Sequence, residues 1–217
     1  MVSQSTNNEL LPALEVTRSQ LTNDFNQISE ERKRALKQLT DFIQAKVNAS
    51  QKIYLNFICT HNSRRSHFSQ LWAQVAVHYY KIPGVECYSG GVETTAFNPR
   101  AVKAMQDAGF NIQKMKEDEN PLYAVRFSHH ANPVFAFSKK YDDASNPRMD
   151  FAAIMTCSHA AENCPLVRGS LARFTITYDD PKDFDNTSQE SAKYKERVEQ
   201  IGREILYAFS QVNSRVV

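Results

Sequence analysis

The sequence predicts an α/β protein built on a doubly wound, four-stranded parallel sheet. From residue 52 onward, apolar runs of strand length alternate with segments of helical spacing, which is typical of parallel sheets covered by helices. We assign residues 52–217 to one domain, with an N-terminal helical extension over residues 1–51 and an inserted β-hairpin at about residues 120–140. The predicted strands cover residues 53–58, 85–89, 151–156 and 171–178.

Length, charge and composition limit the functional classes. With 217 residues, the chain is long enough for one α/β domain and an appendage. Its net charge of +2 gives no indication of nucleic-acid binding. Residues 1–8 lack the basic and apolar regions of a signal peptide, and no apolar stretch approaches the roughly 20 residues that span a bilayer. We expect a soluble cytoplasmic protein without membrane association, whose four cysteines are reduced and reactive.

The N-terminal extension is expected to be helical from about residue 8 to residue 49. Ser29 is a candidate N-cap, because its hydroxyl can accept a hydrogen bond from a free backbone N–H of the following helix. An apolar stripe follows at helical spacing, formed by Leu36, Leu39, Ile43 and Val47. We interpret the extension as a helical hairpin whose stripe packs on the following domain, on a second copy of the chain or on a partner. A homodimer through the N-terminal helices is thus one of the alternatives.

The first predicted strand leads into a tight loop at Cys59 and a helix that begins near Ser66. Such a loop directs backbone N–H groups inward, and the helix dipole adds partial positive charge, so an oxyanion can bind there. The same charges stabilise a thiolate, which makes Cys59 a candidate nucleophile. Arg65 can offer paired donors to a tetrahedral oxyanion, and Ser66 can donate to the thiolate. A structural cysteine beside a basic helix start is the alternative.

The second predicted strand contains Cys87, which we expect to be a packed core thiol. Asn98 and Pro99 then predict the start of a helix, because asparagine is a favoured N-cap and proline is favoured at the first helical position. Gly109 predicts its end.

The inserted hairpin is predicted from period-two alternation in residues 122–127 and 134–137. His129 and His130 lie between these runs. We interpret this pair as part of a solvated turn rather than as metal ligands, because adjacent side chains on a strand or turn point apart.

The third predicted strand delivers Cys157 to its end. Ligands bind at the carboxyl edge of open α/β sheets, so Cys157 is expected on the same side as Cys59. Cys164 follows seven residues later. The spacing of this pair also permits a zinc half-site with His159, or two buried thiols.

The fourth predicted strand ends at an Asp-Asp-Pro run. The carboxyl group of Asp180 could lie over the Cys59 loop and protonate a leaving oxygen, although the run by itself is also typical of a solvated turn. Thr187 and Glu190 form a capping-box pattern before the final helix. The apolar face of that helix is formed by Val198, Ile201, Ile205 and Phe209.

Arg65 and Ser66 follow Cys59 after five intervening residues. This pattern resembles the phosphate-binding loop of the low-molecular-weight protein tyrosine phosphatases and of the thioredoxin-coupled arsenate reductases. The match extends from about residue 53 to residue 205, with the hairpin as an interruption. It implies the phosphotyrosine phosphatase I-like fold and a catalytic domain over residues 52–217. The oxyanion-binding residues that it implies are Thr60, His61, Asn62, Ser63, Arg64, Arg65 and Ser66.

The order of Cys59, the pair Cys157 and Cys164, and Asp180 resembles the reductase branch in particular. This resemblance implies arsenate reduction in which Cys59 attacks, Arg65 holds the oxyanion and Asp180 is the general acid. Cys157 and Cys164 would pass the oxidation on to thioredoxin as an external reductant. No tightly bound cofactor and no metal are implied, and the substrate is arsenate or a phosphate ester.

Some residues depart from the family pattern. Three loop and helix positions differ from the residues that are usual in the reductases, namely His61, Arg64 and Gln70. Because Gln70 stands where an acidic residue often supports a potassium site, the sequence does not decide whether a monovalent cation binds. Lys182 and Asp183 follow the Asp-Asp-Pro run, where tyrosine phosphatases usually carry aromatic residues. The alternatives are a phosphomonoesterase that uses a phosphocysteine intermediate, with the cysteine pair protective, and a non-enzymatic binding or redox-sensing protein that docks a partner through its N-terminal helices.

Overall fold

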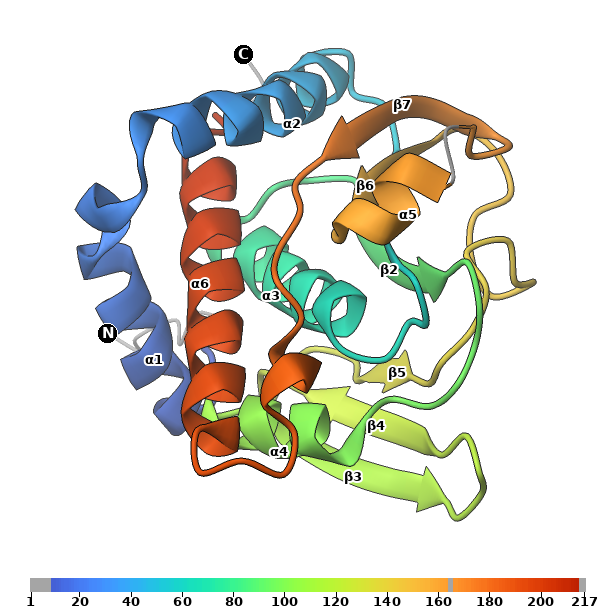
Figure 1. The fold of residues 1–217 in the computed structure, drawn as a ribbon. Helices are drawn as coiled ribbons and strands as arrows, with labels where there is room; N and C mark the ends of the chain where they lie inside the picture. Colours follow the sequence, from blue (N-terminus) through green and yellow to red (C-terminus); the bar gives the residue numbers. More distant parts are fainter. Residues whose placement is uncertain (1–8, 164–165, 215–217) are drawn as a thin grey trace.

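The computed structural model describes residues 9–163 and 166–214 and confirms the predicted fold class. β1 (Ile53–Cys59), β2 (Val85–Gly91), β6 (Phe151–Met155) and β7 (Ser170–Thr175) form a parallel sheet in the order β2-β1-β6-β7 (Figure 1). Ile58 pairs with Met155, so the chain leaves β1 and β6 at the same level of the sheet. The segments that carry Cys59 and Cys157 therefore emerge side by side.

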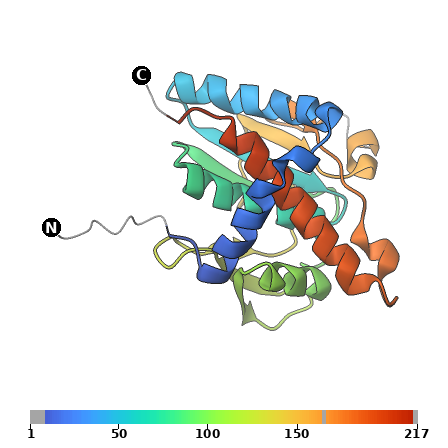
Figure 2. The same ribbon diagram turned by 90° about the vertical axis from the view of Figure 1, so that its left-hand side faces the viewer.

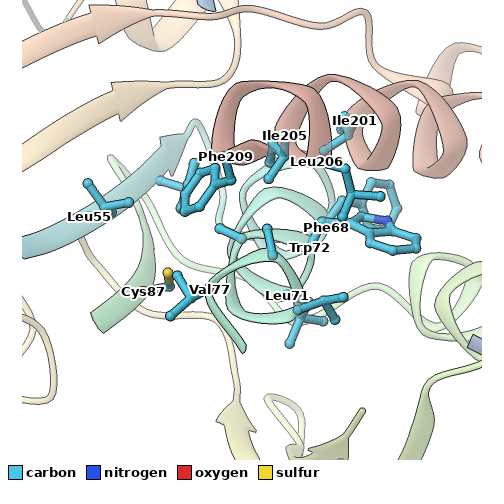
Figure 3. Close-up of a cluster of buried hydrophobic side chains, with 14 of the residues drawn as sticks. Leu55, Phe68, Leu71, Trp72, Val77, Cys87, Ile201, Ile205, Leu206 and Phe209 are labelled. Atoms are coloured by element: carbon cyan, nitrogen blue, oxygen red, sulfur yellow. The ribbon is translucent and has the colours of Figure 1, made fainter. Parts of the chain in front are cut away.

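Helices cover both faces of the sheet, but the two layers differ in size. α3 (Arg65–Tyr80) and α6 (Glu190–Ser210) pack on each other and bury a large apolar cluster against one face (Figure 3). α4 (Pro99–Asp107) packs on α6, whereas the short α5 (Ser158–Asn163) packs on the opposite face over a smaller cluster. β6 supplies both clusters by strand alternation. Within the described residues, no helix combines the length and apolarity needed to cross a membrane.

The N-terminal extension forms α1 (Pro12–Asn23), a short turn η1 (Phe25–Gln27) and α2 (Glu30–Asn48). Ser29 caps α2, because its Oγ accepts a hydrogen bond from the Arg32 N–H at 3.2 Å. The interpretation as a hairpin is wrong in one respect: α1 and α2 pack chiefly on α6 rather than on one another, and Figure 2 shows α1 lying across α6.

The apolar stripe of α2 is buried within the chain, where it joins the large cluster against α6 and the sheet. The stripe thus packs on the following domain, which was one of the predicted alternatives. A homodimer through these helices stays a prediction, as does a domain boundary at residue 51. The buried residues of this stripe are Leu36, Leu39, Ile43 and Val47.

The inserted hairpin is present as β4 (Leu122–Arg126) and β5 (Val134–Ala136). It belongs to a larger antiparallel sheet, because β3 (Asn111–Lys116) pairs with the outer edge of β4. The sequence did not predict β3. Only Ile112 of its six residues is buried, so the alternation that signals a strand is missing.

The segment after β7 leads through the turn η2 (Pro181–Phe184) to α6. The predicted capping box is wrong: Gln189, rather than Thr187, is the N-cap and makes no side-chain cap hydrogen bond. Glu190 instead accepts a hydrogen bond from the backbone N–H of Asn186 at 2.7 Å, while Thr187 Oγ1 accepts from the Gln189 N–H at 3.2 Å. The two side chains therefore accept from neighbouring turn residues rather than from each other's backbone N–H groups.

Candidate active site

The loop between β1 and α3 encloses Cys59. Its Sγ lies 3.0 Å from Ser66 Oγ, and both side chains are buried. Asn62 Nδ2 donates a 2.9 Å hydrogen bond to the same Ser66 oxygen. Because Ser66 accepts from Asn62, its own hydrogen is free to point at the sulfur. The loop thus offers a hydroxyl donor to an anionic sulfur at Cys59.

Contacts on the outer side of the loop fix its backbone. Asn62 adopts the left-handed region with φ of 46°, which asparagine tolerates better than most residues, and its Oδ1 accepts from the Lys139 N–H at 2.9 Å. Gly91 ends β2 directly beside the loop. A Cβ at Gly91 would lie 2.7 Å from Asn62 N and 2.8 Å from Thr60 O, closer than atoms can approach. The loop therefore depends on a glycine at this position.

The predicted oxyanion-binding residues do not all turn their side chains to one another. His61 is half-buried, with Nε2 3.2 Å from a Glu93 carboxylate oxygen. Ser63 Oγ donates to the Ala96 carbonyl at 2.7 Å. The side chains of these two residues thus point to neighbouring segments, whereas Asn62, Arg65 and Ser66 contribute side chains to the network around the loop.

Arg65 reaches across to the segment that follows β7. Its Nη2 lies 2.5 Å from Asp180 Oδ2, and its Nη1 donates to the Tyr178 carbonyl at 2.9 Å. Asp180 Oδ1 also accepts from the Lys182 N–H at 3.2 Å, which caps the turn η2. Two predicted site residues that are 115 positions apart are thus joined in one ion pair.

Arg64 belongs to a buried polar network that the sequence did not predict. Its Nε donates to Tyr194 OH at 2.7 Å, and that hydroxyl donates to Asp185 Oδ1 at 2.8 Å. The guanidinium also lies 3.5 Å from Asp185 Oδ2 and 4.0 Å from Asp180 Oδ1. Burial raises the pKa of Tyr194 to about 12, so its hydroxyl stays protonated. Asp180 therefore lies between two arginines, Arg64 and Arg65.

Cys157 is buried two residues after the end of β6 and next to the loop. Its Sγ lies 3.4 Å from Thr60 Oγ1 and accepts from the Ala160 N–H of α5 at 3.4 Å. Thr60 Oγ1 is also 3.3 Å from His159 Nδ1. The Thr60 side chain thus contacts Cys157. Cys164 lies outside the described residues.

Two of the sequence-based alternatives concern metal ions. Among residues 9–163 and 166–214, no group of three or more His, Cys, Asp or Glu side chains has a geometry that could hold a metal ion. His159, the candidate third ligand of a zinc half-site, lies with its Nδ1 3.3 Å from Thr60 Oγ1. Gln70, at the position relevant to a monovalent cation, donates from Nε2 to the Cys87 carbonyl at 3.0 Å.

Two buried basic groups beside the loop were also not predicted. Lys139 is 5% exposed, and burial lowers its pKa to about 8. His67 is fully buried and stacks on Phe97 with ring centroids 4.1 Å apart. Burial, followed by the charge of Lys139, holds the pKa of His67 well below its usual range, so its ring is neutral. No sequence pattern marks either residue, because their burial depends on the packing of distant segments.

Comparisons with known proteins assign the chain to a class. It is 31% identical over 152 residues to an arsenate reductase of Bacillus licheniformis, covering 69% of this chain and 89% of the relative. It is 27% identical to the arsenate reductase of Bacillus subtilis, with coverage of 69% and 89%. No family model matches the chain. A low-molecular-weight phosphotyrosine phosphatase from Vibrio cholerae aligns with a TM-score of 0.47 at 12% identity, covering 73% and 94% of the two chains.

The sequence similarity to the first of these relatives extends over most of both chains. The chain belongs to the arsenate reductase family. This membership identifies it as an enzyme.

Proposed function

We propose that this protein is a thioredoxin-coupled arsenate reductase, with Cys59 as the nucleophile and Cys157 and Cys164 as the redox relay. The observation that carries the proposal is the 3.4 Å approach of Cys157 Sγ to the hydroxyl of Thr60, the residue that directly follows Cys59. A second thiol is thus close to the oxyanion loop. The 31% identity to an arsenate reductase supports the same reaction.

In the first step, the Cys59 thiolate attacks the arsenic atom of arsenate and forms an S–As bond. The backbone N–H groups of residues 60–66 and the guanidinium of Arg65 hold the arsenate oxygens. One oxygen leaves as water after Asp180 protonates it. The Arg65–Asp180 ion pair supports this assignment, because it keeps the carboxyl group beside the arginine proposed to hold the oxyanion. We expect Arg65 to release Asp180 when it turns its donors to arsenate, so that the carboxyl group can then carry the proton.

In the second step, the Cys157 thiolate attacks Cys59 Sγ and forms a disulfide. The electron pair of the S–As bond stays on arsenic, which is reduced from arsenic(V) to arsenic(III) and leaves as arsenite. Cys164 then attacks Cys157 Sγ, Cys59 leaves as a thiolate, and the dithiol of thioredoxin reduces the resulting Cys157–Cys164 disulfide. Exposed residues at the end of α5, Glu162 and Asn163, support access for an external dithiol.

The second candidate is a phosphomonoesterase, in which water instead of Cys157 resolves the Cys59 adduct. The Cys59 loop, Arg65 and Asp180 serve a phosphate ester as well as arsenate, because both are tetrahedral oxyanions. Lys182 follows Pro181, so an aromatic wall for phosphotyrosine is missing there. In this alternative, the cysteine pair would protect Cys59 by reversible oxidation.

The test is arsenate-dependent oxidation of NADPH by thioredoxin reductase, thioredoxin and the purified protein. We expect sustained oxidation by the parent and none beyond the first turnover in Cys157→Ser or Cys164→Ser. Cys87→Ala is the matched control, because Cys87 is buried away from the loop and should retain the rate. Hydrolysis of 4-nitrophenyl phosphate is measured in parallel.

Sustained arsenate turnover in Cys164→Ser with thioredoxin as the sole reductant would contradict the relay. Phosphatase turnover that needs Cys59 and Asp180, without arsenate-driven NADPH oxidation, would instead establish the phosphomonoesterase. We also assign the protein to the cytoplasm, because the relay requires three reduced cysteines and a thioredoxin system.

A further inference from the structure

The N-terminal extension contributes one partly buried cation to the neighbourhood of the candidate active site. Arg32, on α2, donates from Nε to Glu204 Oε2 of α6 at 2.7 Å. Its Nη2 donates to the Thr177 carbonyl at 3.1 Å, and its guanidinium lies 4.7 Å from the centre of the Tyr178 ring. Glu204 and Tyr178 are both buried. Arg32 therefore ties the extension to the segment that ends at Asp180.

This segment, residues 177–180, is held from several sides. The Tyr178 N–H donates to the Thr156 carbonyl at 3.1 Å, one residue before Cys157. The Tyr178 carbonyl accepts from Arg65, the candidate oxyanion-binding arginine. Strand β7 has already ended at Thr175, so the backbone here lacks a regular ladder to fix it. The position of Asp180 thus depends on individual hydrogen bonds, and one of them comes from Arg32.

We propose that Arg32 is a positioning residue for Asp180, so that the N-terminal extension sets the geometry of the general acid. The inference rests on the proposed function, because it takes Asp180 as the proton donor in the first step. Arg32 touches no reacting atom and acts through the backbone of Thr177 and the ring of Tyr178.

An arginine suits this role because it makes three kinds of contact at once. Its Nε binds the Glu204 carboxylate, another donor reaches the Thr177 carbonyl, and the central carbon of the guanidinium lies over the Tyr178 ring. A lysine has a single ammonium group and cannot match this arrangement. A residue that served only to anchor α2 would need the Glu204 ion pair but not the bond to Thr177.

The test compares arsenate turnover in Arg32→Met, Asp180→Asn and the double variant. A general acid contributes roughly 10²–10⁴-fold to the rate, and we expect its displacement in Arg32→Met to lower kcat about tenfold. The KM for arsenate should stay within about twofold, because Arg32 does not contact the oxyanion loop. In the Asp180→Asn background, Arg32→Met should have almost no further effect.

A second set of variants separates positioning from loss of folding. Arg32→Met leaves Glu204 buried without its cation, so the variant Arg32→Met with Glu204→Gln removes both charges. It should fold, as judged by circular dichroism and melting, and should still lose about tenfold in kcat. Arg34→Met is the matched control, since Arg34 is an exposed arginine on the same helix and should retain the parental rate.

Three results would overturn the inference. A folded Arg32→Met, Glu204→Gln variant with parental kcat would show that Asp180 keeps its geometry without Arg32. If Arg32→Met lowered kcat by the same factor in the parent and in Asp180→Asn, Arg32 would act on something other than the general acid. Parental kcat in Asp180→Asn itself would refute the acid role in the proposed function, and the inference would fall with it.

Discussion

Cys59 and Cys87 lie on neighbouring strands and both are buried, yet their surroundings differ. Cys87 pairs in register with Leu55 inside β1, whereas Cys59 pairs with Gly91 at the end of β2. Burial, followed by the charge of Glu86, raises the pKa of the Cys87 thiol. Cys59 instead contacts Ser66 in the loop that leads to α3. Position along the strand, rather than burial, therefore separates the candidate reactive thiol from the structural one.

The same contrast applies to the whole sheet. Its middle is packed with apolar side chains from α3, α6 and the strands (Figure 3). The carboxyl ends of β1 and β6, together with the segment after β7, carry the polar groups of the site. We expect substitutions in the middle to change stability, and substitutions at the carboxyl ends to change catalysis.

The largest expected effect separates the two cysteines directly. Cys59→Ser should lower arsenate reduction by roughly 10⁴-fold or more, because it removes the proposed nucleophile. Cys87→Ala should keep kcat within about twofold and lower the melting temperature, since it leaves a small cavity beside α3. Steady-state kinetics and thermal melting measure both effects. Similar kcat losses in the two variants would abolish the distinction.

Gly91→Ala should have the next largest effect. Its new Cβ would press on the backbone of Thr60 and Asn62, and a displacement of about 1 Å in such a site can cost 10²-fold. We expect a loss of roughly that size in kcat/KM for arsenate. Cys87→Ala, four residues earlier on the same strand, is the control. A parental kcat/KM in Gly91→Ala would mean that the loop does not depend on this close approach.

Tyr194→Phe should have a smaller effect, because it removes one hydroxyl from the network of Arg64 and Asp185 without removing a charge. We expect kcat to fall roughly three- to tenfold, since Arg64 is then less well fixed beside Asp180. Tyr207→Phe, on the same helix, serves as the control. If both phenylalanine variants behaved alike, the Arg64 network would be structural only.

The smallest effect concerns stability rather than catalysis. Burial lowers the pKa of Lys139 from 10.5 to about 8, so the folded protein releases this proton before the unfolded chain does. Between those values the unfolded state binds more protons, and stability rises with pH. Below about pH 8 the buried Lys139 amine is charged in the folded protein, so the free energy of unfolding is lowered by the full cost of burying that charge. Lys139→Met should therefore raise the free energy of unfolding by about 1–3 kcal/mol at neutral pH.

Urea unfolding at neutral pH and at about pH 10 measures this prediction. The gain from Lys139→Met should shrink at the higher pH, because the parent then loses less by burying a neutral amine. A gain that is equal at both pH values would exclude charge burial as its cause. The backbone N–H of Lys139 still bonds Asn62 in the variant, so loop geometry is retained.

Much of this arrangement could be predicted from the sequence. The strands follow from apolar runs, and parallel strands bring their carboxyl ends together, which correctly predicts that Cys157 lies beside the Cys59 loop. Local signals also identified Ser29 as an N-cap. By contrast, two elements were not predicted correctly. β3 lacks the alternation of buried and exposed residues that signals a strand. At the N-terminus of α6, the side chains of the expected capping box bind turn residues instead.

The partners of the site could not be predicted for a different reason. Arg64 meets Tyr194 across 130 positions, and Arg32 meets Thr177 across 145. Such pairs depend on how helices pack in three dimensions, and a single arginine or tyrosine on a helix has no pattern that identifies its partner. The reactive residues of the loop are close together in the sequence, whereas the residues that hold the loop in place come together only in the folded chain.

The most direct test of the central claim is to map the disulfide that forms in one turnover without thioredoxin. The reduced protein is mixed with arsenate, quenched with an alkylating reagent and digested for mass spectrometry. The proposed relay predicts one equivalent of arsenite and a disulfide between Cys157 and Cys164, with Cys59 alkylated. Recovery of all thiols in the alkylated form, without arsenite, would contradict it.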